Sequence, residues 1–190
     1  MYTPKDFSQL LGLDGLSDAL LNNHFTLYQG YVTNTNKLLE KFDKNEVVVG
    51  TPEFSEFQRR FGWEWNGMRM HELYFGNMSK ENNMPSEDLE IVKALSEKYG
   101  SFENFKNNFI KNVGMFRGIG WVALVKRDDT LGVIWIGEHD EGLLANSQIL
   151  LIMDCWEHAY MTDYGIKRAD YINNFINVID WQAVENRYNK

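Results

Sequence analysis

The chain of 190 residues has a single cysteine, no long apolar run and an excess of acidic residues. Cys155 has no second cysteine to pair with, so intrachain disulfides are excluded and a reducing, cytoplasmic setting is expected. No apolar run approaches the roughly 20 residues that cross a bilayer, so we expect no membrane contact. The N-terminal residues lack the basic start and apolar stretch of a secretory signal, and none is expected.

Positive charge is also scarce. Lys and Arg number 19 against 27 Asp and Glu, which gives a formal net charge of −8. Nucleic acid is therefore not an expected partner, because binding to phosphates needs a basic face. Aromatic residues, in contrast, make up 14% of the chain and need a dry interior. The sequence thus predicts a well-packed globular protein.

Helix signals dominate the first part of the chain. A Thr-Pro pair predicts a first helix from Thr3, and Ser17 predicts the cap of a long helix that ends near Phe42. A second Thr-Pro pair opens another long helix after Thr51, which ends near Gly76. Two long helices with a short connection predict an antiparallel hairpin.

A polar segment with Gly, Asn and Pro at residues 76–88 divides the chain near residue 80. It predicts an N-terminal helical hairpin domain at 1–80 and a C-terminal α/β domain at 81–190, with any site lying between them. No internal repeat or low-complexity tract is visible.

In the C-terminal part, Ser86 and Ser101 are expected to cap two helices. Strand-like alternation then predicts two strands joined by a turn at Asp128, and a third strand at 148–154. One further helix is predicted at 164–188. The fold class is therefore α+β, a helical hairpin followed by a three-stranded antiparallel sheet flanked by helices.

The candidate chemistry rests on a chain with only four histidines. Asp154 ends the third predicted strand, and His158 lies one helical turn beyond it. Such a pair describes a metal site or, more often, a turn-capping aspartate beside a hydrogen-bonded histidine. His71 lies among apolar and aromatic residues, where a neutral imidazole needs a hydrogen bond or a metal for each ring nitrogen. A zinc-protease motif at His71 is excluded, because Phe75 stands where its second histidine is required.

His24 on the first long helix and His139 after the second strand complete the set. Three imidazoles with Asp154 as the one oxygen ligand suit iron or manganese better than a zinc site built on thiolates. Such a set leaves an open coordination position for water or substrate.

The segment "DCWEHAY" resembles the Asp-x-Trp-Glu-His-Ala-Tyr signature of the iron/manganese superoxide dismutase family, with Cys155 at the variable position. Further similar segments are "YVTNTNKL", "GSFENFKNNF", "GIGWVALV" and "DYINNFINVIDW". The resemblance extends from about residue 20 to residue 188. It implies conversion of superoxide to dioxygen and hydrogen peroxide, one iron or manganese ion per subunit, and a homodimer.

Carried over position by position, the resemblance implies that His71, Asp154 and His158 are metal ligands. It also implies two aromatic walls, a tyrosine at the substrate entrance, a glutamate that reaches the partner subunit's ligand histidine, and an arginine near the substrate funnel. In that order these residues are Trp121 and Trp156, Tyr31, Glu157 and Arg168. A local positive funnel would draw superoxide to a chain of net charge −8.

The first ligand departs from the family spacing. Counting back eight residues from Tyr31 gives Asn23, whereas the histidine is His24, seven residues earlier. On a regular helix, residues seven apart lie within about 20° of one face and residues eight apart differ by about 80°. A one-residue π-bulge accommodates the longer spacing, and its deletion restores a regular helix with the ligand in place. His24 is therefore the expected fourth ligand.

Two further departures concern the surroundings of the metal. The family's outer hydrogen-bond donor is a glutamine, and the matching positions here hold Gly67 and His139, so His139 is the expected donor and the choice of metal stays open. A His–Tyr pair at the family's subunit contact corresponds to Leu27 and Met161. Losing both members together leaves no buried polar group without a partner.

Other functions stay open at this point. One is a non-catalytic binding or assembly protein that keeps the fold. Another is a metalloprotein of altered activity, such as an iron oxidase that uses two histidines and a carboxylate if His24 does not bind. The retained His71, Asp154 and His158 favour the dismutase.

Overall fold

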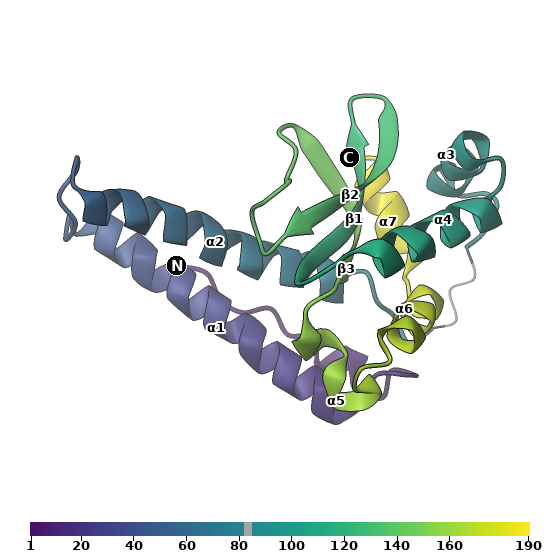
Figure 1. Cartoon of the computed structure of the whole chain (residues 1–190), viewed down its shortest axis with the longest axis horizontal. Helices are drawn as coiled ribbons and strands as arrows, with labels where there is room; N and C mark the ends of the chain where they lie inside the picture. The colour runs from purple at the N-terminus through teal and green to yellow at the C-terminus, as the bar shows by residue number, and fades with distance from the viewer. Residues whose placement is uncertain (82–84) are drawn as a thin grey trace.

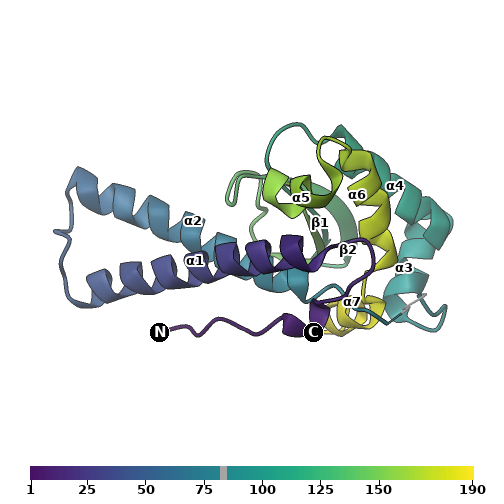
Figure 2. The same ribbon diagram turned by 90° about the horizontal axis from the view of Figure 1, so that it is seen from below.

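The computed structural model describes residues 1–81 and 85–190. Two long helices, α1 (Asp18–Asp43) and α2 (Pro52–Phe75), form an antiparallel pair that projects from a body built of a sheet and shorter helices (Figure 1, Figure 2). The expected helical hairpin is thus confirmed. Across the described residues, no helix combines the length and apolar character that a bilayer crossing needs.

Both long helices begin where the sequence predicts. The Ser17 hydroxyl accepts a hydrogen bond from the Leu20 backbone N–H at 3.1 Å, and the Thr51 hydroxyl accepts one from Phe54 at 3.2 Å. Each cap satisfies a backbone donor that has no partner within its helix, which sets the starting point. α2 ends at Gly76, also as expected.

The helix expected from Thr3 is wrong. The first residues form an extended arm along α1, and only Ser8–Leu10 makes a short 3-10 turn (Figure 2). The Tyr2 backbone N–H donates to Asn36 at 2.7 Å, and the Lys5 backbone N–H donates to the Tyr28 hydroxyl at 3.0 Å. These bonds to α1 replace the hydrogen bonds that a helix would have made.

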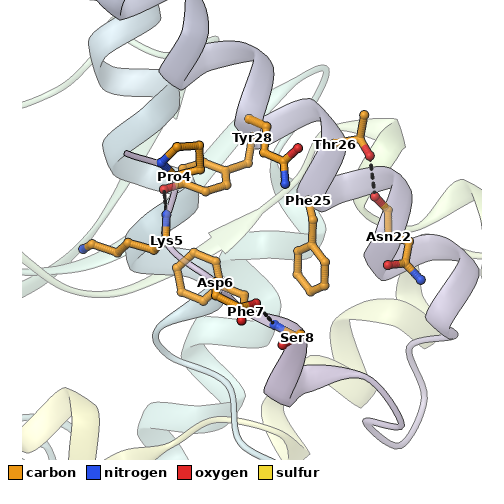
Figure 3. Close-up of a pocket in the computed structure, with 10 residues that line it drawn as sticks. Pro4, Lys5, Asp6, Phe7, Ser8, Asn22, Phe25, Thr26 and Tyr28 are labelled. Carbon is orange, nitrogen blue, oxygen red and sulfur yellow. Dashed lines mark hydrogen bonds between the residues drawn. The ribbon is translucent and has the colours of Figure 1, made fainter. Parts of the chain in front are cut away.

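The arm and α1 enclose a surface cavity of about 400 Å³ (Figure 3). Phe7 and Phe25 line it, and the bond from Lys5 to Tyr28 crosses one end. The Lys5 ammonium lies 2.9 Å from the Glu72 carboxylate and is therefore already paired. None of the four histidines or Asp154 lines this cavity.

The sheet contains β1 (Gly120–Arg127), β2 (Thr130–Gly137) and β3 (Ser147–Asp154), all antiparallel in the order β2-β1-β3. Asp128 adopts φ +47° in the turn between β1 and β2, at the predicted position. Trp121 pairs with Asp154 across the β1–β3 ladder. This register brings an indole and a carboxylate together at one end of the sheet.

The sequence predicts serine caps for two of the shorter helices, and the structure confirms one of them. α4 (Phe102–Met115) follows Ser101, whose hydroxyl accepts from Asn104, as predicted. α3 is Glu90–Tyr99 and starts four residues after Ser86, so that expected cap is wrong. The Ser86 hydroxyl instead accepts from the Asp88 N–H at 3.2 Å. The carboxylate of Glu185 supplies the cap, because it accepts from the first two N–H groups of α3 at 3.1 and 2.8 Å.

The single C-terminal helix expected at 164–188 is also wrong. The chain forms α5 (Met161–Tyr164), α6 (Arg168–Asn177) and α7 (Trp181–Tyr188). Residues 178–180 leave the helix to make backbone hydrogen bonds with residues 77–79. Asp180 then caps α7 by accepting from Ala183 at 3.0 Å. The boundary expected near residue 80 belongs to a segment whose residues 82–84 lie outside the described residues.

Candidate metal centre

Four side chains from separate elements converge at the base of the helical hairpin. His24 comes from α1, His71 from α2, Asp154 from the end of β3, and His158 from the 3-10 helix Glu157–Ala159. One potential ligand atom from each lies within 4.8 Å of all the others. The sequence predicted these four residues as a set, and the fold brings them together.

Asp154 lies at the centre of the group. Its Oδ2 atom is 3.1 Å from His158 Nε2, 3.2 Å from His24 Nε2 and 3.7 Å from His71 Nε2. His24, His71 and Asp154 are buried, whereas the His158 side chain remains 26% exposed. Three imidazole nitrogens therefore point toward one carboxylate oxygen.

The hydrogen bonds around the imidazoles show that a cation fits between them. His71 Nδ1 lies 2.6 Å from the Gly67 carbonyl, an acceptor, so the ring proton is on Nδ1 and Nε2 carries a lone pair. That Nε2, and both nitrogens of His24, have no hydrogen-bond partner among the described residues. A buried lone pair facing a carboxylate is unfavourable unless a positive ion lies between them. Three nitrogens and one oxygen suit iron or manganese.

Burial and neighbouring charges set the protonation of His24, His71 and Asp154. It lowers the pKa of His24 and of His71, so both imidazoles are neutral near pH 7 and offer lone pairs. Burial alone would raise the pKa of Asp154, but His158 and His24 outweigh it and hold that pKa well below its ordinary value. The group thus holds a carboxylate at Asp154 and neutral imidazoles at His24 and His71, the protonation that metal binding requires of these three side chains.

His24 and Asn23 lie on different faces of α1. His24 is 1% exposed and points into the group, whereas the neighbouring Asn23 is exposed to solvent. α1 is regular over its whole length, and Tyr31, two turns after His24, lies on the same buried face.

Tyr31, Trp121 and His139 form a hydrogen-bonded chain beside the four converging side chains. Trp121 Nε1 donates to His139 Nδ1 at 3.0 Å, and His139 Nε2 lies 2.9 Å from the Tyr31 hydroxyl. An indole nitrogen can only donate, so the proton of the neutral His139 is on Nε2 and is donated to the Tyr31 oxygen. The Tyr31 hydroxyl proton therefore points away from His139 and remains free for another acceptor.

The same residues are shielded from water. Burial lowers the pKa of His139 to about 4 and raises the pKa of Tyr31 well above its ordinary value. Trp121 packs at 5.0 Å against the His71 ring, and Trp156 stacks on His139 at 5.0 Å. Both tryptophans thus pack against the group, and at neutral pH Tyr31 keeps its hydroxyl proton while His139 is a neutral imidazole.

Two other predicted site residues lie farther out. Glu157 is exposed. The Arg168 guanidinium donates to the backbone carbonyls of Phe116 and Val113 at 2.9 and 3.3 Å, at the C-terminal end of α4. Neither makes a described hydrogen bond to the four converging residues. Their placement near a partner subunit and a substrate funnel remains a proposal.

Sequence reasoning did not find the positioning roles of three residues near the group. Tyr171 donates to the Asp154 carbonyl at 2.8 Å, and the Gly67 carbonyl orients His71. Trp63 covers His139, with ring centroids 4.5 Å apart. Trp63, Gly67 and His71 recur at intervals of four on α2, and this helical spacing was the available signal.

Comparison with known proteins agrees with this geometry. A sequence model of the C-terminal domain of iron/manganese superoxide dismutases matches residues 85–187, more than half of the chain. The chain belongs to the iron/manganese superoxide dismutase family. It is 32% identical to an iron superoxide dismutase of Pyrobaculum aerophilum over 88% of the chain and 81% of that protein. It is also 32% identical to an iron superoxide dismutase of Saccharolobus solfataricus, over 91% of the chain and 83% of that protein.

Relatives named for the other metal are similarly close. A manganese superoxide dismutase of Haloferax volcanii is 31% identical over 91% of the chain and 87% of that protein. The cofactor of this superoxide dismutase family member is one iron or manganese ion per subunit, and the four converging residues offer one site for it. Similarity to relatives of both kinds does not separate iron from manganese.

Proposed function

We propose that His24, His71, Asp154 and His158 hold the iron or manganese ion with which this enzyme converts superoxide to dioxygen and hydrogen peroxide. The observation that carries the proposal is the approach of three imidazole Nε2 atoms to Asp154 Oδ2, at 3.1 to 3.7 Å. The lone pair on His71 Nε2 faces a buried carboxylate, and this arrangement needs a cation to be stable.

The bound ion supplies one-electron oxidation and reduction in alternate half-reactions. The side chains of the protein supply the rest. His24 and His71 supply neutral imidazoles and Asp154 supplies a carboxylate, and Trp121 and Trp156 exclude water from them. In a dry site, the electrostatic contribution of each group is larger than it would be in water.

The reduction of superoxide to hydrogen peroxide also consumes protons. Tyr31 holds a proton on its hydroxyl, and His139 holds one on Nε2 that is donated to the Tyr31 oxygen. We assign the delivery of a proton to superoxide to Tyr31. His139 donates a hydrogen bond to the Tyr31 oxygen and so stabilises the negative charge left there when the proton is transferred.

Glu157 and Arg168 belong to a wider part of the proposal. An exposed Glu157 beside a partly exposed His158 supports a contact from a second subunit at this edge, and hence a homodimer. Met161 and Ile166, 46% and 94% exposed, support an apolar contact on the same stretch. We assign Arg168 the role of a positive charge that draws superoxide toward the site.

The remaining assignments concern organisation and setting. A hairpin domain at 1–80 and a second domain at 81–190, with the metal between them, is supported by the start of the family match at residue 85. A cytoplasmic setting is supported by the one cysteine, Cys155, which is buried and unpaired.

Metal reconstitution tests the function. The purified protein is freed of metal, loaded with iron or with manganese, and assayed for superoxide removal, with the metal-free protein and a loaded His71→Ala variant as controls. We expect fast removal by at least one loaded form and background rates from both controls. Tight binding of one ion per chain without superoxide removal would contradict the proposal.

A further inference from the structure

Trp63 lies over the hydrogen bond between His139 and Tyr31. It sits on α2 one helical turn before Gly67 and is partly buried. Its ring is 4.5 Å from the His139 ring at an interplanar angle of 67°, and 5.7 Å from the Tyr31 ring. Although His139 belongs to a loop, it is 0% exposed, and Trp63 is one of the three tryptophans that enclose it.

Gly67 contacts the Tyr31 ring from the backbone of α2. A Cβ atom on Gly67 would lie 2.6 Å from Cδ1 of Tyr31, which is closer than real Cβ atoms come to a neighbour. The Tyr31 ring therefore rests directly on the backbone of α2, with Trp63 beside it. This contact fixes the distance from the Tyr31 hydroxyl to His139.

Two charged side chains contact Trp63 on the side that faces solvent. Its Nε1 donates to the Glu138 carboxylate at 3.2 Å, and the Arg60 guanidinium lies 4.9 Å from its ring centroid. Arg60 is itself fixed, because its Nε donates to the buried carboxylate of Glu64 at 2.7 Å. Hydrogen bonding at the edge and a cation over the face both restrict how the indole turns.

Glu138 connects this arrangement to the histidine. It is the residue directly before His139 and adopts φ +48°, a left-handed backbone that is costly for a side chain of this size. Such a conformation persists when neighbouring contacts hold it. The bond from Trp63 to the Glu138 side chain is one such contact, and it ties the loop to α2.

We propose that Trp63 is a positioning residue that holds the His139 imidazole against Tyr31 and keeps water away from their hydrogen bond. Glu138 and Arg60 serve this role by fixing the indole. The effect of Trp63 on catalysis rests on the proposed function, whereas its effect on the position of His139 does not. A readout on the metal-free protein therefore separates the two.

The test compares Trp63→Ala with Trp65→Ala. Trp65 lies on the same helix, is also partly buried and packs against Tyr2 and Phe61 instead. In full-length metal-free protein, solvent exchange of the Trp121 indole N–H and the ring-nitrogen shifts of His139 are followed by NMR. We expect exchange to be about tenfold faster in Trp63→Ala, and unchanged in Trp65→Ala. No acceleration in Trp63→Ala, or equal acceleration in both variants, would overturn the proposal.

A second pair of variants leaves the indole in place. Glu138 is exposed, so its replacement does not endanger folding. Glu138→Ala removes the acceptor of Trp63, whereas Glu138→Gln keeps an acceptor oxygen. We expect about three- to tenfold faster Trp121 exchange in Glu138→Ala, the effect of one ordinary hydrogen bond, and recovery in Glu138→Gln. Unchanged exchange in Glu138→Ala would contradict the proposal even if Trp63→Ala did not fold.

Kinetics of the metal-loaded protein add a further readout. If Trp63 positions the proton donors, its replacement by Ala lowers kcat more than kcat/KM, because proton delivery limits turnover at high superoxide. Equal loss in both constants would indicate a general structural defect instead.

Discussion

The two ends of the helical hairpin are built from the same pair of helices but differ in what covers them. At the far end, Phe42 packs edge to face against three phenylalanines, and all four rings remain partly exposed; the partners of Phe42 are Phe54, Phe57 and Phe61. At the near end, His24, His71 and Phe75 are 0–1% exposed. An amphipathic pair of helices therefore creates a dry site only where other elements cover it.

The covering elements explain where the chemistry lies. β3 and the short helices that follow it pack on the near end, and the N-terminal arm runs along α1 toward that end, whereas the far end contacts mainly itself (Figure 1, Figure 2). Burial shifts the pKa of a side chain and strengthens its electrostatic interactions. A histidine at the far end would stay solvated and would titrate near its ordinary pKa.

The largest expected effect is on metal affinity, and it should differ between two adjacent residues at the near end. Replacing His24 by Ala removes a buried nitrogen of the proposed metal site, while Asn23→Ala changes only an exposed neighbour. We expect His24→Ala to lower metal affinity by more than about 100-fold, and Asn23→Ala to leave it unchanged. Metal content after reconstitution and dialysis measures this. Loss of metal in Asn23→Ala alone would show that the helix register at the metal centre is wrong.

Packing should differ between the two ends by a measurable free energy. Phe75→Ala opens a cavity in the fully buried near end and should cost about 3–5 kcal/mol of unfolding free energy. Phe57→Ala removes a partly exposed ring and should cost about 1 kcal/mol. Denaturant unfolding of the metal-free protein measures both. Equal losses would mean that the far end is covered in solution, for example by another chain.

A pair of glycines on α2 tests the contact between the Tyr31 ring and the helix backbone at Gly67. Gly67→Ala forces a Cβ atom to within 2.6 Å of the Tyr31 ring and should destabilise the protein by about 1–3 kcal/mol. Gly62→Ala, on the same helix with open space around it, should stabilise by about 0.5–1 kcal/mol. Thermal unfolding measures the difference. A stabilised Gly67→Ala variant would show that Tyr31 does not rest on this backbone.

The pH dependence of stability should also reflect the buried imidazoles. His24, His71 and His139 have lower pKa values in the folded protein than the ordinary 6.5, so the unfolded chain takes up protons first as the pH falls. Stability is therefore lost below pH 6.5, and the contribution of His139 levels off near pH 4. Between pH 7 and pH 5 we expect His139 alone to account for a loss of about 1–2 kcal/mol.

The matched variant for this effect is His139→Gln, which removes one titrating group and retains a hydrogen-bond donor. Denaturant unfolding of the metal-free protein at each pH should give a shallower loss for the variant. A loss as steep as that of the original chain would assign the effect to other groups.

Much of the fold was predictable because its signals are local. Ser17, Thr51 and Ser101 each cap a helix by accepting from the N–H three residues later, so short sequence patterns are enough to find them. The cap of α3 comes from Glu185, which is far away in sequence, and no local pattern contains it. The break between α6 and α7 is likewise caused by bonds to residues 77–79.

The sequence by itself determined the long helices, the sheet and the identity of the four converging residues, since caps, periodicity and the "DCWEHAY" segment are all read along the chain. Tertiary structure alone decided that His24 Nε2 lies 3.2 Å from Asp154 Oδ2, that His139 donates to Tyr31, and that Trp63 covers them. Each of these depends on atoms from elements far apart in sequence meeting in a space without water. The burial of these side chains, the direction of their lone pairs and the position of their protons follow from these long-range contacts. No single segment of the sequence determines them.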